Sequence, residues 1–196
     1  EGSFFDLPFL FPSRGVAYTV LNDSEFWKIM SDTFAPKGFA VIGYGENEIR
    51  DFTNNKREVR KPEDIKGLKV RVMESPVYLE TWKTLGASSV GMPFGEVYKA
   101  LQQGVIDAQE NPIMTSVLMK FTEVTPYVTI LNYSLTASFK IVNLDIWNQL
   151  KPEQQEIFYQ GAQMATRAGR EGSMKLTGEL IAELEKAGKT KVTRLT

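Results

Sequence analysis

The sequence contains neither histidine nor cysteine among its 196 residues. Their absence excludes a Ser-His-Asp triad and a Cys-His pair as the basis of catalysis. It also excludes zinc sites that use cysteine or histidine ligands. Acid–base catalysis would need Asp, Glu, Lys or Tyr side chains with shifted pKa values. These absences narrow the possible chemistry and leave acid–base catalysis by those residues open.

A strong net charge and long apolar runs are also absent. The 23 Lys and Arg residues nearly balance the 24 Asp and Glu residues, which gives a net charge of −1, and no long basic run occurs. This balance argues against nucleic acid or an anionic membrane as the main partner. No apolar run approaches the ~18 residues that would cross a bilayer. The 42% hydrophobic content is typical of a globular protein with a core.

Strand and helix signals alternate along the first two thirds of the chain. Period-two or apolar runs predict strands, and apolar stripes at helical spacing predict helices. This alternation predicts an α/β fold built from βαβ units with right-handed crossovers. The expected strands cover residues 39–44, 68–73, the segment up to 92, and 105–111, and the expected helices begin at 23 or 24, after Ser75, and after Pro93.

The stretch "GLKVRVMES", residues 67–75, places an arginine near the end of a short strand. Leu68, Val70 and Val72 alternate with polar residues, and Arg71 sits just before a helix that Ser75 and proline begin. In open α/β sheets, ligands bind beyond the carboxyl ends of the strands. Arg71 is therefore either a solvated face position or a ligand contact at that end.

Two long elements follow in the second half of the chain. Residues 127–143, "YVTILNYSLTASFKIVN", are rich in β-forming residues and have no central turn signal. Residues 152–186 are expected to be helical, begun by Pro152 and ended by Gly188. Elements of this length would suit a two-lobed body. A coiled coil is the alternative for the helix, although no sustained heptad is present.

An ordered series of motifs resembles one protein family. The series comprises "DLPFLF", "RDFTNNKREVRKPEDIKG", "GLKVRVMESPVYLETWKTLGASSVGMPFGEVYKALQQGVIDAQENP" and "KFTEV". Together these motifs resemble the solute-binding proteins of tripartite ATP-independent periplasmic (TRAP) transporters, from Phe4 to Leu195. The resemblance implies a periplasmic, two-lobed α/β binding protein that closes on a small organic acid and delivers it to membrane permease subunits, without chemistry on the ligand. It therefore implies no catalytic residues, no metal ligands and no cofactor.

The resemblance also implies five ligand-binding residues. Arg71 matches the arginine that pairs with the ligand carboxylate, and a guanidinium suits that role because it donates two parallel hydrogen bonds. Asn111 in "QENP" matches a polar contact, and Phe94 in "MPFGEVY" matches an aromatic one. Arg50 resembles a second arginine near the site. Tyr133 lies where the family often places a contact beside the hinge.

Each of these assignments has a structural alternative. Asn111 precedes proline and could cap the following helix, and Phe94 begins an apolar stripe and could belong to the core. Asp107 and Glu110 are a candidate pair of catalytic carboxylates. Residues three apart in a strand point to opposite faces, so we interpret both as structural.

The resemblance predicts how the chain divides between lobes. Residues 1–48 are assigned to part of lobe I, and residues 49–135 to lobe II. Residues 136–175 return to lobe I with the hinge strand and the start of the long helix, and residues 176–196 return to lobe II. Family members are usually longer at both ends, so we expect a chain that is truncated at both ends.

Two other functions remain open at this level. One is an enzyme that acts on an organic acid through carboxylates or tyrosine, together with a metal ion. The other is a carboxylate-sensing module that controls a partner by hinge closure. Turnover of a candidate acid would identify the enzyme, and co-purification with membrane components would identify the transport protein. The sequence does not specify which acid is bound.

Overall fold

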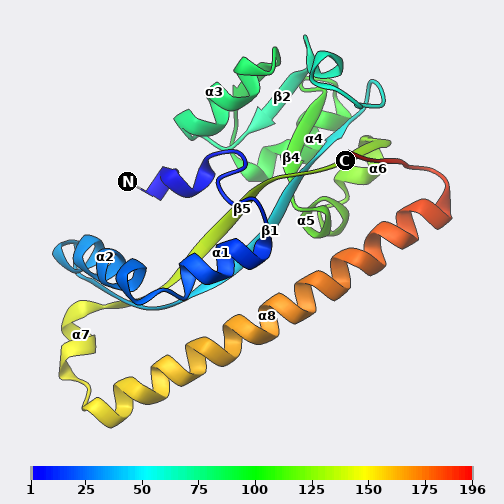
Figure 1. Cartoon of the computed structure of the whole chain (residues 1–196). Coiled ribbons are helices and arrows are strands. Elements are labelled where there is room, and N and C mark those ends of the chain that lie inside the picture. The colour runs from blue at the N-terminus through cyan, green and yellow to red at the C-terminus, as the bar shows by residue number, and fades with distance from the viewer. Residues whose placement is uncertain (1, 196) are drawn as a thin grey trace. The chain divides into compact units, whose positions relative to one another are not determined.

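The computed structural model describes residues 2–195, apart from the side chains of residues 3, 46 and 47. The fold is mixed α/β, as predicted (Figure 1). One sheet contains six strands in the order β3-β2-β4-β1-β5-β6. The strands are β1 (Phe39–Asn54), β2 (Lys69–Val72), β3 (Ser88–Gly91), β4 (Ala108–Asn111), β5 (Tyr127–Asn143) and β6 (Lys191–Arg194).

Helices connect and follow these strands. The α-helices are α1 (Arg14–Leu21), α2 (Ser24–Phe34), α3 (Pro76–Thr84), α4 (Val97–Gln102), α5 (Ile113–Leu118), α6 (Phe121–Val124), α7 (Leu144–Gln149) and α8 (Pro152–Ala187). Short 3-10 helices are η1 (Gly2–Asp6), η2 (Ala35–Lys37), η3 (Pro62–Ile65) and η4 (Phe94–Glu96).

The chain divides into two compact units. The larger unit contains residues 1–10, 48–136 and 174–196, and the smaller contains residues 11–47 and 137–173. Strands β1 and β5 and helix α8 each contribute residues to both units. The first ten residues belong to the larger unit, whereas the sequence grouped them with residues 11–48. The assignment of these units to the two lobes of a binding protein stays a prediction.

Most of the predicted elements form where the sequence indicates. The long strand covers 127–143, and the long helix runs from Pro152 to Ala187. Asp23 caps α2 by accepting hydrogen bonds from two backbone N–H groups. Strand β1 differs from the prediction, because it continues to Asn54 instead of ending near residue 44. Helix α1, capped by Ser13, was not predicted.

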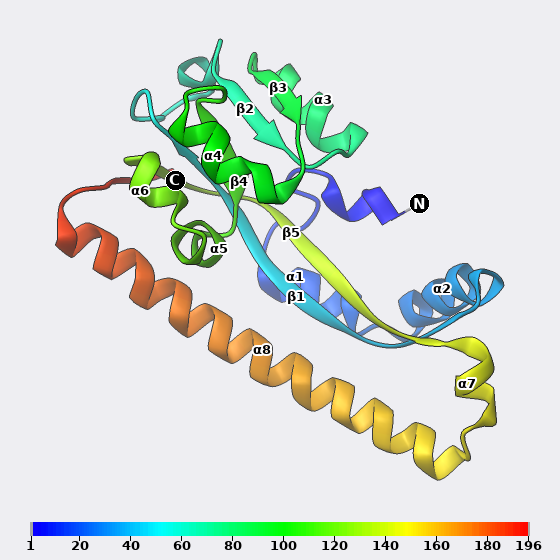
Figure 2. The same cartoon turned by 180° about the vertical axis from the view of Figure 1, so that it is seen from behind.

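The sheet register separates the side chains of the larger unit onto two faces. Strand β2 is parallel to β3 and to β4, and β4 is antiparallel to β1. Figures 1 and 2 show α3 and α4 on either side of β2 and β4. Because side chains alternate along a strand, each face receives its own core. The core beside α3 is built around Phe52, Val70, Val72, Tyr78 and Trp82, and the core beside α4 around Val97, Leu101, Ile106 and Phe121.

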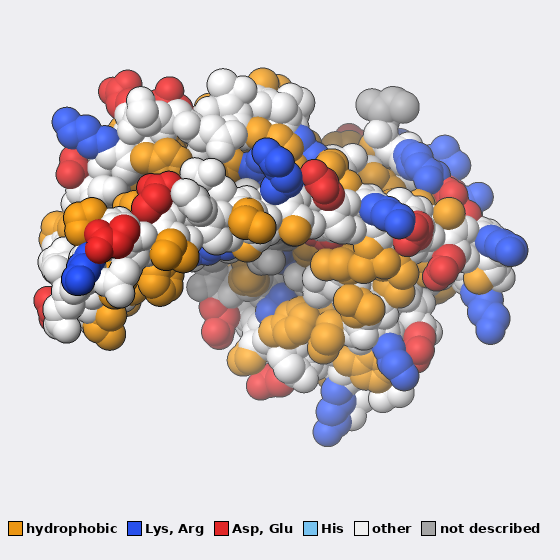
Figure 3. Space-filling view, turned by 90° about the horizontal axis from the view of Figure 1, so that it is seen from below, with side chains coloured by type: hydrophobic (Ala, Val, Ile, Leu, Met, Phe, Trp, Pro, Cys, Tyr) orange, Lys and Arg blue, Asp and Glu red, His pale blue; other side chains and the backbone are white. Residues whose placement is uncertain are grey.

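No helix among residues 2–195 combines the length and the apolar character needed to cross a bilayer. Helix α8 is long, but charged residues are spread along it. On the face in Figure 3, lysine and arginine side chains are interspersed with aspartate and glutamate side chains. That face therefore has no patch of a single charge sign.

Within the smaller unit, α8 packs closely against β1 at a glycine. A Cβ atom built at Gly43 would lie 2.8 Å from the Cβ of Ala162. Ala162 is buried, so the helix has little room to move aside. Lys140 reinforces the contact, since its Nζ donates to the Tyr44 carbonyl at 2.6 Å and to Thr166 Oγ1 at 3.0 Å.

We expect Gly43→Ala to lower the free energy of unfolding by about 1–3 kcal/mol, because overpacking forces the helix off its strand. Gly161→Ala is the matched control. Gly161 lies in α8 beside Ala162, and nothing lies within 4 Å of its Cβ position. That replacement should raise the stability by about 0.5–1 kcal/mol through helix propensity. Urea denaturation of both variants measures the difference, and equal effects would contradict the close packing.

Candidate functional site

The five residues singled out from the sequence all lie in the larger unit. Arg71 is on β2, Asn111 ends β4, and Phe94 begins η4. Arg50 is on β1 and Tyr133 is on β5. Hydrogen bonds, an ion pair and a cation–π contact join them into two neighbouring groups, one around Arg71 and one around Arg50.

Arg71 is buried, with 2% of its surface exposed. Its Nε and Nη2 donate to the Met92 carbonyl at 2.9 and 2.7 Å, while Nη1 is buried and has no hydrogen-bond partner among the described residues. No carboxylate within the described chain lies at ion-pair distance from it. Arg71 is thus a buried cation with unused hydrogen-bonding capacity.

The charges around Arg71 affect its pKa in opposite directions. Burial lowers the pKa of the Arg71 guanidinium below its ordinary value, and the positive charge of Arg50 adds to that change, while the Glu110 and Glu74 carboxylates oppose it. A guanidinium nevertheless stays protonated at physiological pH. The negative charge of an anion beside Arg71 would offset both the energetic cost of burying the guanidinium and its repulsion from Arg50.

Phe94 covers Arg71 from the side of η4. The Arg71 Cζ lies 5.8 Å from the centre of the Phe94 ring, within the range of a cation–π contact. Phe94 also meets Phe121 edge to face, with the ring centres 5.8 Å apart. Because 39% of Phe94 is exposed, it is not a fully buried core residue.

Arg50 forms a buried ion pair with Glu110. Its Nε lies 2.5 Å from Glu110 Oε2, and its Nη2 donates to Glu110 Oε1 at 2.9 Å and to the Glu110 carbonyl at 2.8 Å. Burial alone would lower the pKa of Arg50, but the Glu110 carboxylate raises it well above its ordinary value. The interpretation of Glu110 as a structural residue agrees with this pairing.

Tyr133 joins the same group through its hydroxyl, which donates to Glu110 Oε2 in a short hydrogen bond. Burial and the negative charge of Glu110 raise the pKa of Tyr133 well above its ordinary value, so the hydroxyl remains a donor. Its ring packs edge to face on Trp82. The tyrosine therefore holds Glu110 in place from β5.

Asn111, at the end of β4, bonds to both Arg50 and Gln109. Its Oδ1 accepts from Arg50 Nη2 at 3.0 Å, and its Nδ2 donates to Gln109 Oε1 at 2.6 Å. Arg50 and Glu110 lie on one face of the sheet, whereas Gln109 and Arg71 are neighbours on the opposite face. At the end of β4, Asn111 therefore contacts residues from both faces.

Gln109 could not be selected from the sequence, because its importance depends on which residues the sheet register places beside it. Asp107, also interpreted as structural, accepts a hydrogen bond from the Lys69 N–H at 2.9 Å and pairs with Lys56 at 3.1 Å. Within the described part of the chain, no group of three or more Asp, Glu, His or Cys side chains could hold a metal ion.

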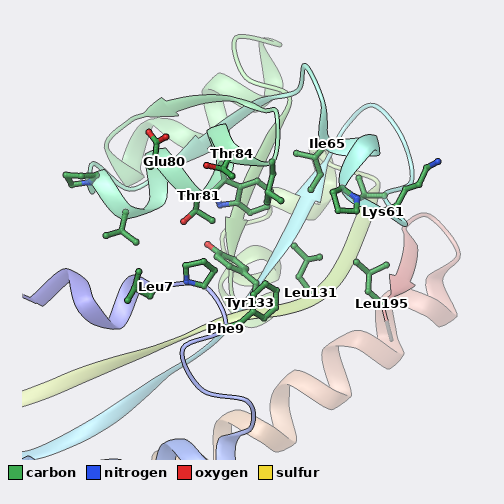
Figure 4. Close-up of a pocket in the computed structure, with 17 residues that line it drawn as sticks. Leu7, Phe9, Lys61, Ile65, Glu80, Thr81, Thr84, Leu131, Tyr133 and Leu195 are labelled. Atoms are coloured by element: carbon green, nitrogen blue, oxygen red, sulfur yellow. The ribbon is translucent and has the colours of Figure 1, made fainter.

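A cavity of about 730 Å³ opens elsewhere in the larger unit, between residues 7–9, α3 and the segment around η3 (Figure 4). Its lining is almost entirely apolar, and Tyr133 is the one residue that it shares with the five candidates. It offers no buried cation for a carboxylate. We therefore place the candidate site at Arg71 and Asn111. The residues that line the cavity are Leu7, Pro8, Phe9, Val59, Lys61, Pro62, Ile65, Pro76, Val77, Glu80, Thr81, Trp82, Thr84, Leu85, Leu131, Tyr133 and Leu195.

Comparison with known proteins identifies relatives of this chain. A solute-binding protein of Verminephrobacter eiseniae is 32% identical over 195 residues, which cover 100% of this chain and 58% of the relative. A TRAP periplasmic solute-binding protein of Polaromonas sp. JS666, solved with D-erythronate, is 31% identical with a TM-score of 0.90 and covers 99% of this chain. The chain spans 63% of that structure.

A third relative is the sugar acid binding protein DctPAm of Advenella mimigardefordensis, solved with galactonate. It is 36% identical, with a TM-score of 0.87, and the match covers 98% of this chain and 61% of that one. The chain thus spans about 60% of the length of these relatives.

A family match covers the whole chain. The family described as "Bacterial extracellular solute-binding protein, family 7" matches residues 1–196. Its members are non-enzymatic solute-binding proteins, so the enzyme alternative is wrong. The resemblance predicted from the motifs is confirmed, and the chain belongs to family 7 of the bacterial extracellular solute-binding proteins, the TRAP periplasmic solute-binding proteins.

Proposed function

We propose that the protein captures a small organic acid in the periplasm and delivers it to the membrane subunits of a TRAP transporter. The carboxylate of the acid binds Arg71, beside Phe94 and Asn111. Arg50 and Tyr133 support the site through Glu110. Among organic acids, sugar acids are the first candidates, because two of the relatives were solved with D-erythronate and galactonate.

One observation carries this proposal. Arg71 is buried with no carboxylate of the described residues at ion-pair distance, and its Nη1 has no hydrogen-bond partner there. A buried cation without a counter-ion is unfavourable, because it has lost its hydration without gaining an ion pair. A ligand carboxylate would supply both the charge and the hydrogen-bond acceptor that Arg71 lacks.

The contacts of Arg71 also limit the geometry of binding. Nε and Nη2 already donate to the Met92 carbonyl. The edge of the guanidinium that includes Nη1 is the one left for a ligand. Phe94 beside it provides an apolar surface for the carbon chain of the acid.

Titration calorimetry with matched pairs of compounds tests the proposal. D-Erythronate and galactonate each have a reduced counterpart, erythritol and galactitol, that keeps the hydroxyl groups and lacks the carboxylate. We expect at least one acid to bind and to raise the unfolding temperature, while its polyol does neither. Equal binding of an acid and its polyol would contradict recognition through Arg71. Absence of binding by either acid would remove sugar acids as the ligand class.

A further inference from the structure

The orientation of the Asn111 amide is fixed by its neighbours. A guanidinium donates hydrogen bonds and accepts none, so the atom 3.0 Å from Arg50 Nη2 must be the oxygen of Asn111. The amide nitrogen is therefore on the other side, where it lies 2.6 Å from Gln109 Oε1. Arg50, which the ion pair with Glu110 holds in place, thus binds one side of the Asn111 amide, and Gln109 binds the other.

Gln109 uses all of its polar atoms in this arrangement. Its Oε1 accepts from Asn111, so its Nε2 faces away and donates to Thr53 Oγ1 at 2.9 Å and to Ser116 Oγ at 3.0 Å. Gln109, Thr53 and Ser116 have no exposed surface. Since no water reaches these groups from the surface, Gln109 Oε1 is the acceptor that Asn111 Nδ2 depends on.

The same network continues toward Phe94. The Thr53 and Thr125 hydroxyl oxygens lie 3.0 Å apart, and Thr125 Oγ1 donates to the Phe121 carbonyl at 2.7 Å. The ring of Phe121 packs against Phe94. Buried hydrogen bonds in series strengthen one another and favour a single arrangement. The network therefore supports both the amide and the aromatic side of the site.

We propose that Gln109 is a positioning residue, and that it sets the specificity of the site by holding the Asn111 amide as a hydrogen-bond donor. Asn111 Oδ1 is occupied by Arg50 and one Nδ2 hydrogen by Gln109, which leaves the second Nδ2 hydrogen for the ligand. The ligand atom beside Asn111 must then be an acceptor, a carboxylate or hydroxyl oxygen. This inference rests on the proposed function for the identity of the ligand as an acid.

A double-mutant cycle tests the inference with D-erythronate, or with galactonate if that acid binds more tightly. Gln109→Met keeps the approximate size and removes the acceptor, and we expect about tenfold weaker binding. In an Asn111→Ala background, the same replacement should weaken binding by less than twofold, since Gln109 acts through Asn111. Gln102→Met, the same replacement at an exposed glutamine of α4, is the control and should stay within twofold of the wild type. If the losses of affinity from Gln109→Met and Asn111→Ala multiply in the double variant, the two residues act independently and the proposal is wrong.

A measurement without ligand separates this inference from the proposed function. Proton NMR of 15N-labelled protein reports the exchange of the Asn111 side-chain amide hydrogens with water. We expect the hydrogen bonded to Gln109 to exchange at least tenfold faster in Gln109→Met than in the wild type. Unchanged exchange would overturn the proposal. If the exchange accelerates but the wild type binds neither acid, the sugar-acid function fails and the positioning of Asn111 stands.

A second variant covers the case in which Gln109→Met does not fold. Gln109→Glu keeps an acceptor toward Asn111, and the Thr53 and Ser116 hydroxyls can rotate to donate to the new carboxylate. We expect this variant to retain more protection of the Asn111 amide than Gln109→Ala does. Equal loss of protection in the two variants would show that the oxygen of Gln109 does not hold Asn111.

Discussion

Glu110→Leu is expected to lower the free energy of unfolding by about 3–5 kcal/mol, because it leaves the Arg50 charge buried and unpaired. Only 3% of Arg50 is exposed, and Glu110 is fully buried, so water cannot replace the lost carboxylate. The guanidinium would retain Asn111 and the Glu110 backbone carbonyl as its acceptors. Neither group carries a compensating negative charge.

The double replacement Arg50→Met with Glu110→Leu distinguishes the lost ion pair from a general packing defect. Removing both charges should recover at least half of the stability lost in Glu110→Leu, since an apolar pair of similar volume avoids the cost of burying charge. Glu80→Ala, which breaks the exposed pair of Glu80 with Lys83, is the control and should have a much smaller effect. Urea denaturation measures all three variants. A double variant less stable than the single one would contradict the explanation by charge.

The regular parts of the fold were predictable from local patterns. The strand at 127–143 was predicted to its exact bounds, because it is a long run of β-forming residues without glycine or proline. Ser75 and Pro76 marked the start of α3 in the same way. In these segments the residues that determine the structure are neighbours in the sequence.

The second half of β1 was not predictable from local patterns. Its polar and charged residues resemble a loop, but they are buried and bonded to residues far along the chain. Arg50 pairs with Glu110, and Asp51 Oδ1 accepts from the backbone N–H groups of Leu131 and Asn132 at 2.8 and 2.9 Å. A local pattern cannot identify partners that are 60 or 80 residues away.

The same limit applies to the candidate site. Arg71 could be selected because an arginine at the end of a strand matches a family motif. Gln109 could not, because its contacts with Thr53 and Asn111 depend on the pairing of β4 with β1. A site that depends on one residue type can be predicted from the sequence. A hydrogen-bond network can be identified only when the pairing register of the strands is known.

Arg71 gives the prediction with the largest expected effect on binding. Truncating one partner of a buried charge pair costs roughly 2–5 kcal/mol, because the other charge stays desolvated. At about 1.4 kcal/mol per tenfold, Arg71→Ala should weaken the binding of the acid by about 30-fold to several thousandfold. Arg71→Lys should also lose much of the affinity, since an ammonium cannot donate in the planar geometry of a guanidinium.

Stability must be measured beside affinity, because Arg71 also bonds to the Met92 carbonyl and is buried. We expect Arg71→Ala to lower the free energy of unfolding, because the Met92 carbonyl loses its hydrogen-bond donors. We expect the acid to stabilise the wild type by about 2.7 kcal/mol at a concentration a hundredfold above its dissociation constant. Arg60→Ala, at an exposed arginine, is the matched control and should leave binding unchanged. Calorimetric titration of the folded variants with the bound acid decides the assignment. If Arg71→Ala and Arg71→Lys both bind within threefold of the wild type, the carboxylate does not bind at Arg71, and the unpartnered Nη1 requires another explanation.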